Sequence, residues 1–314
     1  MTRKGIVDLG LNSISIRLVD AFREHMFGGN AAGVVTNAEG LNKQQMLNIA
    51  RELNASTTVF VVESRNQLYQ IRFFTPLTEI NACGHATLAL FHCLALDGRL
   101  KPKGPRLGRV ASAIAVAPSG KTTAQTEFEG SIPMRVMLAF KPARLRAAKL
   151  STNYVGKALG IRANLILQPI RIAHTGLRHL LVRLPSLNSL EQLAPQLISL
   201  SKLAERANVD AVCVFCTETK DPHSAAHSRD FTAPIGHYEE PASGTTTTAL
   251  AKYLICEGLT RLREGSNELT FEQGFEMQRP SIIRACVDMR KNRMRGISVG
   301  GYAKVAMSGE MFLD

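Results

Sequence analysis

The spacing of apolar residues along the chain predicts both strands and helices. The segment YQIRFFTP, residues 69–76, alternates apolar and polar positions and is rich in strand-forming residues, so we expect a strand that ends at Pro76. Residues 41–54 instead place their apolar side chains on one helical face, which predicts an amphipathic helix. Residues 190–206 predict short helices that are interrupted at Pro195. Further strands are expected over residues 13–22, 57–64, 177–186, 210–218, 267–274, 281–290 and 297–313.

Two segments that lie half a chain apart, 73–96 and 230–259, carry the same features in the same order, which indicates an internal duplication. Each contains Phe-Thr and a proline, reaches a glycine at Gly84 or Gly244, and continues into an apolar run. The run after Gly84 is apolar on nearly every side, which is typical of a helix that is buried all round. We therefore expect two similar halves, each with a helix wrapped by strands. Residues 101–127, rich in Lys, Pro, Gly and Ser, are expected to connect them.

Four threonines stand where the second of these helices is expected to begin, in the segment PASGTTTTAL. Threonine is a mediocre helix former because its branched side chain restricts its rotamers. The first backbone N–H groups of a helix have no partner within it, and together with the helix dipole they attract an anion. Two interpretations stay open. The hydroxyl groups only cap the helix, or Ser243, Gly244, Thr245 and Thr246 line a carboxylate-sized site, with Gly84 in the equivalent place of the first half.

The composition and charge of the chain favour a folded enzyme or binding protein over a nucleic-acid partner. The chain has 314 residues, of which 45% are hydrophobic and 20% are charged, as in ordinary globular proteins. The formal net charge is +12, with basic residues dispersed apart from clusters at 141–149 and 290–295. A solvated basic surface explains this charge, and steering of an anionic substrate is a second interpretation. Because no zinc finger, helix-turn-helix or aromatic RNA-binding motif is present, no nucleic-acid partner is expected.

The apolar stretches are too short for a membrane protein. None reaches the roughly 18 residues that a membrane span needs. The first residues, MTRKGIVDLGLNSIS, have neither the apolar core nor the cleavage site of a secretory leader. We therefore expect no membrane partner and a cytoplasmic location.

Six scattered cysteines are expected to stay as thiols in such a compartment. Cys213 and Cys216 form a C-x-x-C pair, which in other contexts binds metal or is redox-active. Here they lie in the apolar run DAVCVFCTE, so we expect a buried strand in which they pack as small hydrophobic residues. The sequence carries no nucleotide-binding fingerprint and no metal-ligand cluster. Neither a cofactor nor a metal is therefore expected.

Five segments of the chain carry motifs that occur together in one family: 19–35, 73–89, 230–254, 272–281 and 297–311. They resemble the phenazine-biosynthesis isomerase (PhzF-like) family, and they follow in the right order over nearly the whole chain. The resemblance implies an α+β diaminopimelate-epimerase-like fold. In that fold, two pseudo-symmetric halves each wrap a barrel-like sheet around a central helix, with the active-site cleft between them. We expect the first half over residues 12–128, joined by the C-terminal strand 299–314, and the second half over 129–298.

The sequence departs from the family at the position of its catalytic glutamate. Family members resemble LNLSETTFV where this chain reads LNASTTVFV, so Thr57 stands in place of the glutamate that serves as general acid/base. A threonine hydroxyl has no useful pKa near neutrality and cannot replace that base. The resemblance matches His85 to the family's histidine, Glu240 to its second-site aspartate and Thr245 to its serine. Asn30, in the FGGN motif, is expected to bind substrate with Thr57.

Three residues are candidates for the proton-transfer chemistry. His85 and Glu240 are the first two, since histidine titrates near neutrality and a buried glutamate can. Cys83 is the third, because related epimerases carry a cysteine at each helix start, and a thiol there has a lowered pKa. Ser243 stands where the partner cysteine would be, which favours one-sided proton removal over a balanced racemase. The alternatives stay open that Cys83 only packs and that His85 only orients other groups.

Two functions are compatible with these residues. The first is a cofactor-independent isomerase, epimerase or lyase that moves a proton on a small carboxylate derived from an amino acid or a dihydroaromatic acid. The second is a catalytically silent family member that binds a small anion or a protein partner, as the absence of the glutamate at Thr57 suggests. Resemblance to the family also implies a homodimer.

Overall fold

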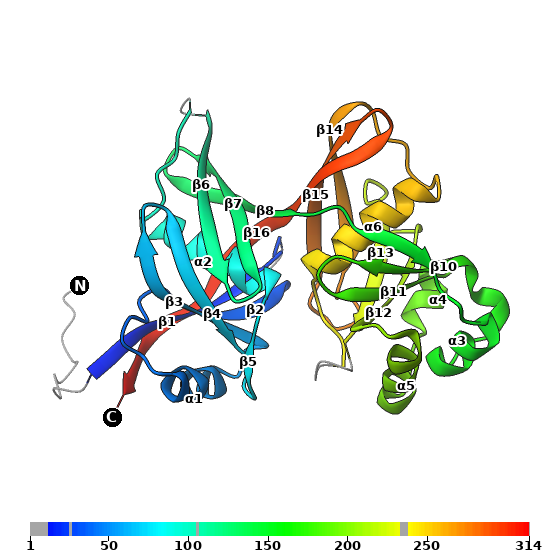
Figure 1. Cartoon of the computed structure of the whole chain (residues 1–314), viewed down its shortest axis with the longest axis horizontal. Helices are drawn as coiled ribbons and strands as arrows, with labels where there is room; N and C mark the ends of the chain where they lie inside the picture. Colours follow the sequence, from blue (N-terminus) through cyan, green and yellow to red (C-terminus); the bar gives the residue numbers. More distant parts are fainter. Residues whose placement is uncertain (1–11, 25–26, 105–106, 233–237, 314) are drawn as a thin grey trace.

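The structure is a computed structural model that describes residues 12–24, 27–104, 107–232 and 238–313. Within these ranges the strands form one continuous sheet of sixteen strands, and α-helices pack against and inside it (Figure 1). The strands are β1 (Asn12–Ala21), β2 (Asn30–Val35), β3 (Thr57–Arg65), β4 (Leu68–Phe74), β5 (Glu79–Ile80), β6 (Leu107–Ala117), β7 (Gly120–Glu129), β8 (Ile132–Phe140), β9 (Arg144–Ala147), β10 (Leu167–His174), β11 (Arg178–Arg183), β12 (Ala211–Cys216), β13 (Ala226–Phe231), β14 (Gly265–Gln273), β15 (Ser281–Arg290) and β16 (Arg293–Leu313). The helices are α1 (Lys43–Leu53), α2 (Gly84–Leu96), α3 (Thr152–Leu159), α4 (Leu187–Glu191), α5 (Leu197–Ala207) and α6 (Gly244–Cys256), with a short 3₁₀ turn at Ala163–Leu165.

The first half is a closed barrel around helix α2. Its strands follow the order β1-β2-β3-β4-β6-β7-β8-β16, and β16 pairs back onto β1 to close the ring. Helix α2 runs through the barrel, and every residue from His85 to Ala95 is buried. This confirms the helix expected after Gly84. It also explains why its apolar side chains point in all directions, since strands surround it on all sides.

The second half is an open sheet that curls around helix α6. From β16 the strand order continues β15-β14-β13-β12-β11-β10-β9, and α6 lies against its inner face (Figure 1). Helices α3, α4 and α5 contribute to a separate apolar cluster with strands β11 and β12. Cys213 and Cys216 lie in β12 and are fully buried, which confirms their assignment to a buried strand. The expected two-half α+β architecture with a helix inside each sheet is therefore confirmed, with one barrel closed and the other open.

Several other local predictions are confirmed by the backbone. Helix α1 occupies the amphipathic segment, and it begins after Asn42, whose side chain accepts the N–H of Gln45. Strand β4 ends shortly before Pro76, and α5 follows Pro195. Both helix starts fall at the expected glycines, since α2 begins at Gly84 and α6 at Gly244.

The expected connection over residues 101–127 is wrong. These residues supply most of β6 and β7, which pair with each other inside the first barrel. Alternating small apolar residues such as Ala111, Ala113 and Ala115 are buried there, a strand signal that the flanking Lys, Pro and Gly obscured. Strand β8, placed beyond the boundary expected at residue 128, pairs with β7 and packs on α2. The chain therefore passes to the second half only after Phe140.

Strand β16 belongs to both halves. Its first part pairs with β15, its middle with β8, and its last part with β1. The crossing over β8 is close: a Cβ at Gly300 would overlap the carbonyl oxygen of Val136 and lie 2.7 Å from the Cα of Met137. Only glycine allows this approach between the two backbones.

A cation from the second half ties the halves together. Arg279 donates to the carbonyl oxygens of Gly29 at 2.7 Å and Gly28 at 3.0 Å, and it pairs with the buried carboxylate of Asp20 at 2.7 Å. The N–H of Gly29 in turn donates to the carbonyl of Pro280 at 3.1 Å. These bonds hold the start of β2 against the loop that precedes β15.

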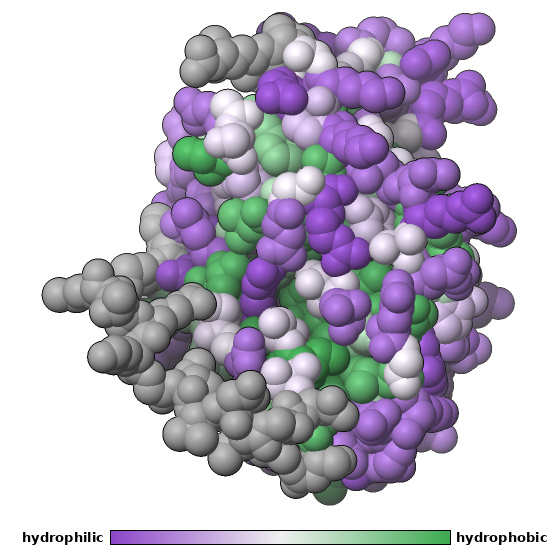
Figure 2. Space-filling model, turned by 90° about the vertical axis from the view of Figure 1, so that its left-hand side faces the viewer, coloured by the Kyte–Doolittle hydropathy of each residue, from purple (hydrophilic) through white to green (hydrophobic). Residues whose placement is uncertain are grey.

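The part of the surface that Figure 2 shows is largely polar, in keeping with the dispersed charges. On the face of the first half that Figure 2 shows, hydrophilic residues surround small areas of apolar residues. None of the helices in the described ranges is both long and apolar enough to cross a membrane. The beginning of the chain, on which the expectation of no secretory leader rests, lies largely outside the described residues.

We expect Gly300→Ala to destabilise the protein because the added methyl group forces β16 away from β8. The free energy of unfolding, measured by urea titration, should fall by roughly 2–3 kcal/mol, which is typical of overpacking. Gly309→Ala, in the same strand with no atom within 4 Å of the added Cβ, is the matched control. Equal effects of the two substitutions would contradict the close approach at Gly300.

Candidate functional site

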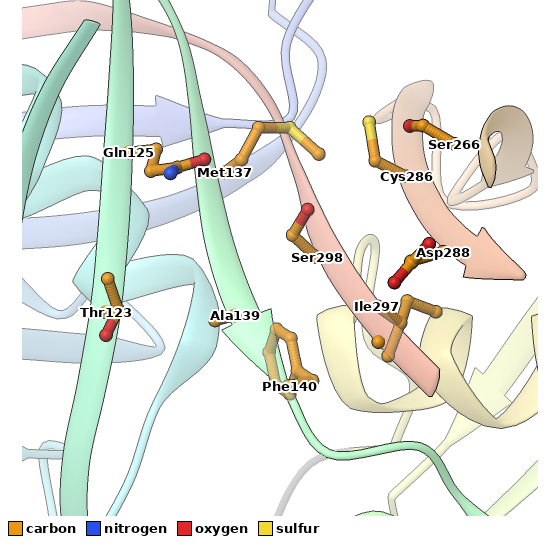
Figure 3. Close-up of a pocket in the computed structure, with 11 residues that line it drawn as sticks. Thr123, Gln125, Met137, Ala139, Phe140, Ser266, Cys286, Asp288, Ile297 and Ser298 are labelled. Atoms are coloured by element: carbon orange, nitrogen blue, oxygen red, sulfur yellow. The ribbon is translucent and has the colours of Figure 1, made fainter. Parts of the chain in front are cut away.

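The starts of the two central helices lie on either side of one aromatic ring. A Cβ at Gly244 would lie 3.3 Å from Cζ of Phe140, and a Cβ at Gly84 would lie 3.9 Å from the same atom. Figure 3 shows Phe140 at the end of β8, between the two helices. The helix starts that were identified as a duplication in the sequence therefore meet where the two halves join.

One amide connects the two halves at this place. Asn30, at the start of β2, donates through Nδ2 to Oε2 of Glu240 at 2.7 Å and to the carbonyl of Ala242 at 3.0 Å. The same nitrogen lies 3.2 Å from Nδ1 of His85. Asn30 and His85 come from the first half and Glu240 from the second. Three residues predicted separately from the sequence are thus brought into one buried cluster.

The ring of His85 is held on both nitrogens. The hydroxyl of Ser56 lies 3.0 Å from Nε2, and the sulfur of Cys83 lies 3.4 Å from Nδ1. Ser56 also donates to the carbonyl of Ala31 at 3.1 Å. Sequence reasoning missed Ser56, because the comparison with the family drew attention to Thr57 and not to the hydroxyl that precedes it.

The pKa of the Glu240 carboxyl lies near neutrality. Burial raises its pKa to about 7, and the hydrogen bond from Asn30 opposes this rise. An acid with this pKa is populated in both forms at neutrality, which suits a group that takes and returns a proton. One segment fixes its backbone: Gln273 donates to the carbonyl of Glu240 at 2.7 Å, and a Cβ at Gly274 would lie 2.9 Å from the Cα of Pro241.

The pKa of Cys83 moves opposite to the direction expected for a thiol at a helix start. Burial raises it to about 12, although a hydrogen bond to the side chain of Thr57 and backbone N–H groups at the start of α2 lower it. The loss of water around the sulfur outweighs the helix dipole, so Cys83 stays a neutral thiol at physiological pH. Thr57 itself is buried beside it and is 4% exposed.

At the start of α6, the threonines have different roles. Ser243 caps the helix by accepting the N–H of Thr246 at 3.3 Å, which supports the capping interpretation for this residue. The hydroxyls of Thr247 and Thr248 donate to helix carbonyls at 2.9 Å. Thr245 is half-buried, and its hydroxyl lies 3.2 Å from that of Ser243.

Thr246 leads to two residues that the sequence did not identify as part of a site. Its hydroxyl donates to Oδ2 of Asp230 at 2.6 Å and lies 3.3 Å from Nδ1 of His179. Both partners are 1% exposed. Asp230 stands in the strand that precedes Glu240, but a single acid in a strand carries no distinctive sequence signal.

A separate groove of about 370 Å³ opens on the sheet where the two halves diverge (Figure 3). Gln125 and Met137 line it from the first half, and Cys286, Asp288 and Ser298 line it from the second half and the shared strand. None of the described residues in the cluster around Asn30 and Glu240 lines this groove. The cluster around Asn30 and Glu240 therefore lies at the helix starts and not in this groove.

Comparison with known sequences places these features in a group of related proteins. A family model described as phenazine biosynthesis-like protein matches residues 19–309. An uncharacterized isomerase of Clostridium acetobutylicum is 30% identical over 310 residues, which covers 94% of this chain and 97% of that protein. The uncharacterized isomerase YddE of Escherichia coli K12 is 28% identical and also covers 94% of this chain and 97% of its own length.

Solved structures share the same fold. A phenazine biosynthesis protein of the PhzF family from Bacillus anthracis superimposes with a TM-score of 0.84 at 24% identity, covering 96% of this chain and all of its own. A hydroxyproline epimerase from Agrobacterium vitis, solved with bound trans-4-hydroxy-L-proline, gives a TM-score of 0.62 at 13% identity, covering 96% and 93%. These likenesses extend over both halves.

The raised pKa of Glu240 predicts a pH dependence of stability. Between the ordinary glutamate pKa of 4.5 and about 7, the folded protein holds a proton that the unfolded chain releases, so stability falls as pH rises through this window. Glu240→Gln removes this loss. The free energy of unfolding of the variant minus that of the native protein should therefore increase by roughly 2 kcal/mol from pH 5 to pH 8.

This comparison is made by urea unfolding at several pH values. Groups that do not interact with Glu240 act equally in both proteins and cancel in the difference. Asp230 is the exception, because the charge of Glu240 raises its pKa, so the comparison is repeated in an Asp230→Asn background. Glu205→Gln, on an exposed position of α5, controls for the loss of one negative charge. A difference for Glu240→Gln that stays constant from pH 5 to pH 8 would contradict a buried, titrating Glu240.

Proposed function

The chain belongs to the phenazine biosynthesis-like (PhzC–PhzF) family, and from this premise and the site geometry we propose that it is an isomerase-type enzyme that moves a proton on a small carboxylic acid. The observation that carries the proposal is the amide of Asn30, which bonds Glu240 of the second half and contacts His85 of the first. Two groups suited to acid/base catalysis, one from each half, thus contact the same amide.

Glu240 is the principal proton carrier in this mechanism. Its ionised form removes a proton from a carbon of the substrate, and its protonated form returns one. His85, held by Ser56 and Cys83, faces the same space from the start of α2 and supplies or accepts the second proton. In the isomerisation, Glu240 takes a proton from one position of the substrate and His85 delivers one at another. A proton then passes from Glu240 to His85, so that both groups return to their starting forms.

The site suits removal of a proton from one face of the substrate rather than a balanced exchange between two faces. Cys83 stays protonated because burial raises its pKa to about 12, and Ser243 has no thiol to match it. A symmetric two-thiol racemisation is therefore disfavoured, and a double-bond shift or a related rearrangement is favoured. Transfer between a carboxyl group and an imidazole requires neither a metal nor an organic cofactor, so we propose a cofactor-independent reaction.

A carboxylate is the substrate feature that this site suits. The starts of α2 and α6 both lie beside the ring of Phe140, and the first backbone N–H groups of a helix bind anions with the help of the helix dipole. Thr245, half-buried at the start of α6, offers a hydroxyl donor beside them. The net charge of +12 steers anions toward the protein. Acids derived from amino acids or dihydroaromatic rings fit this description. Homodimer formation and a cytoplasmic location stay predictions.

A second function is favoured by one observation, the hydroxyl of Thr57 in place of a glutamate. Thr57 hydrogen-bonds Cys83 and provides no carboxyl beside His85. If both carboxyls were needed for turnover, the chain would be a catalytically silent member that binds a small anion or a protein partner. The arrangement of Glu240 with Asn30 and His85 makes the enzyme our first choice.

Deuterium incorporation tests the enzyme directly. The purified protein is incubated in heavy water with amino acids, hydroxy acids, dihydro-hydroxyanthranilate and trans-4-hydroxy-L-proline, and products are analysed by mass spectrometry. We expect deuterium at a carbon of at least one acid. Glu240→Gln should lower the exchange rate at least about 100-fold, since it removes the proton carrier.

Cys83→Ser separates the candidate bases. It should retain exchange within about tenfold, since the neutral thiol acts only on the orientation of His85. Cys256→Ser, at an exposed cysteine, is its matched control. Full exchange by Glu240→Gln would exclude Glu240 as the proton carrier. A wild-type protein that exchanges none of the acids would favour the silent, anion-binding function.

A further inference from the structure

Asp230 is a buried acid that the mechanism above does not use. It lies in β13 and is 1% exposed. One carboxyl oxygen, Oδ2, accepts the hydroxyl of Thr246 at 2.6 Å. The other, Oδ1, has no hydrogen-bond partner among the described residues. A buried carboxyl with one unpartnered oxygen lowers the stability of the fold. The contact of such a group with the start of α6 therefore requires an explanation.

A chain of three hydroxyls leads from Asp230 to the start of α6. The oxygen of Thr246 lies 3.0 Å from that of Ser243, which lies 3.2 Å from that of Thr245. Each hydroxyl has one proton to donate and lone pairs that accept. The direction of one bond therefore fixes the direction of the next, and the bonds strengthen each other when they all run the same way.

We propose that Asp230 is a positioning residue that acts through Thr246 and sets the direction in which Ser243 and Thr245 donate their hydroxyl protons. When Asp230 is protonated, it donates to Thr246, and the chain runs outward so that Thr245 donates to a substrate carboxylate. When Asp230 is ionised, Thr246 donates to it and the chain turns inward. The start of α6 thereby binds anions only in the first state.

This inference rests on the proposed function for the identity of the ligand, a carboxylate, but not for the hydroxyl chain itself. It gives the second half a distinct task. Glu240 and His85 transfer the proton, whereas the start of α6 recognises the acid group. Binding of the carboxylate takes up a proton at Asp230, so affinity falls as pH rises above the midpoint of Asp230.

The groups around Asp230 allow both of its states near neutrality. Burial raises its pKa to about 7, Thr246 lowers it, and the charges of Glu240 and Glu239 raise it. Glu239 is paired with Arg229. On β11, burial lowers the pKa of His179 to about 4, so this ring is neutral.

Cys213 faces Asp230 from β12, where the two residues pair in register, and burial raises the pKa of its thiol. A neutral thiol adds no charge beside the carboxyl. The titrating neighbour that matters most is therefore Glu240, whose ionisation disfavours that of Asp230.

The titration of Asp230 tests the hydroxyl chain without any substrate. Infrared spectra are recorded from about pH 5 to about pH 9 on protein whose aspartate side chains carry ¹³C, and the spectrum of Asp230→Asn is subtracted. Thr246→Val should raise the midpoint of Asp230 by about one to two pH units, because the ionised carboxylate loses its donor. Ser243→Ala should give a smaller rise in the same direction.

Ser243 does not touch Asp230, so a shift on its substitution reports transmission through the hydroxyl of Thr246. Thr248→Val is the matched control, since this hydroxyl is buried on the same helix but bonds the carbonyl of Gly244. The proposal would be overturned if Thr246→Val or Ser243→Ala gave the same midpoint for the titration of Asp230 as Thr248→Val.

The second measurement uses the acid identified by deuterium exchange. In the native protein, KM should rise up to tenfold per pH unit above the midpoint of Asp230. Asp230→Asn keeps a donor toward Thr246 at every pH, so this rise in KM should disappear while kcat is retained within a few-fold. An unchanged rise in KM would overturn the role in binding. If no acid exchanges, the proposed function fails, and the infrared titration still decides whether Asp230 controls the chain.

Discussion

A helix with apolar side chains on every face has to be enclosed by other parts of the chain, and this requirement organises the molecule. Helix α2 is buried from its second residue almost to its end, and the barrel around it closes only because β16 returns to pair with β1. The same strand pairs with β15 and so begins the sheet that curls around α6. One strand therefore completes the enclosure of α2 and starts that of α6. As a result, the two helix starts lie beside the same ring, that of Phe140.

The enclosure that stabilises the fold also sets the chemistry. Water is excluded from the helix starts, and this exclusion raises the pKa of Glu240 and Asp230 to about 7 and that of Cys83 to about 12. The effect on carboxyls is useful, because it brings them into the range where protons move at neutral pH. The same rise has the opposite consequence for the thiol, because Cys83 then stays protonated at neutral pH. The two helix starts of the duplicated architecture thus differ chemically. The start of α2 holds His85, and the start of α6 holds hydroxyls backed by Asp230.

The sequence was sufficient for the architecture and for part of the site. The glycines at the two helix starts, the apolar run that follows Gly84 and the match of several motifs to one family predicted the helix-in-barrel halves correctly. The local composition led to a wrong prediction for β6 and β7, which were expected to be a connecting segment. Lysines, prolines and glycines flank these strands, and alternation between small residues is a weak strand signal. Ser56, His179 and Asp230 could not be recognised, since each acts through contacts with residues distant in sequence. Likewise, the pKa of Cys83 depends on how completely the surrounding chain removes water, which sequence position alone does not reveal.

The end of β14 and the loop that leads to β15 hold the backbone on both sides of the contact between Glu240 and Asn30. Gln273 holds the backbone of Glu240, and six residues later Arg279 holds the backbone of Gly29, next to Asn30. Any separation of the halves that admits a ligand must therefore either break the Arg279 bonds or carry the start of β2 along. While Arg279 stays docked, Glu240 and Asn30 keep their mutual distance. For the function proposed here, access of a ligand and alignment of the site are therefore mechanically coupled.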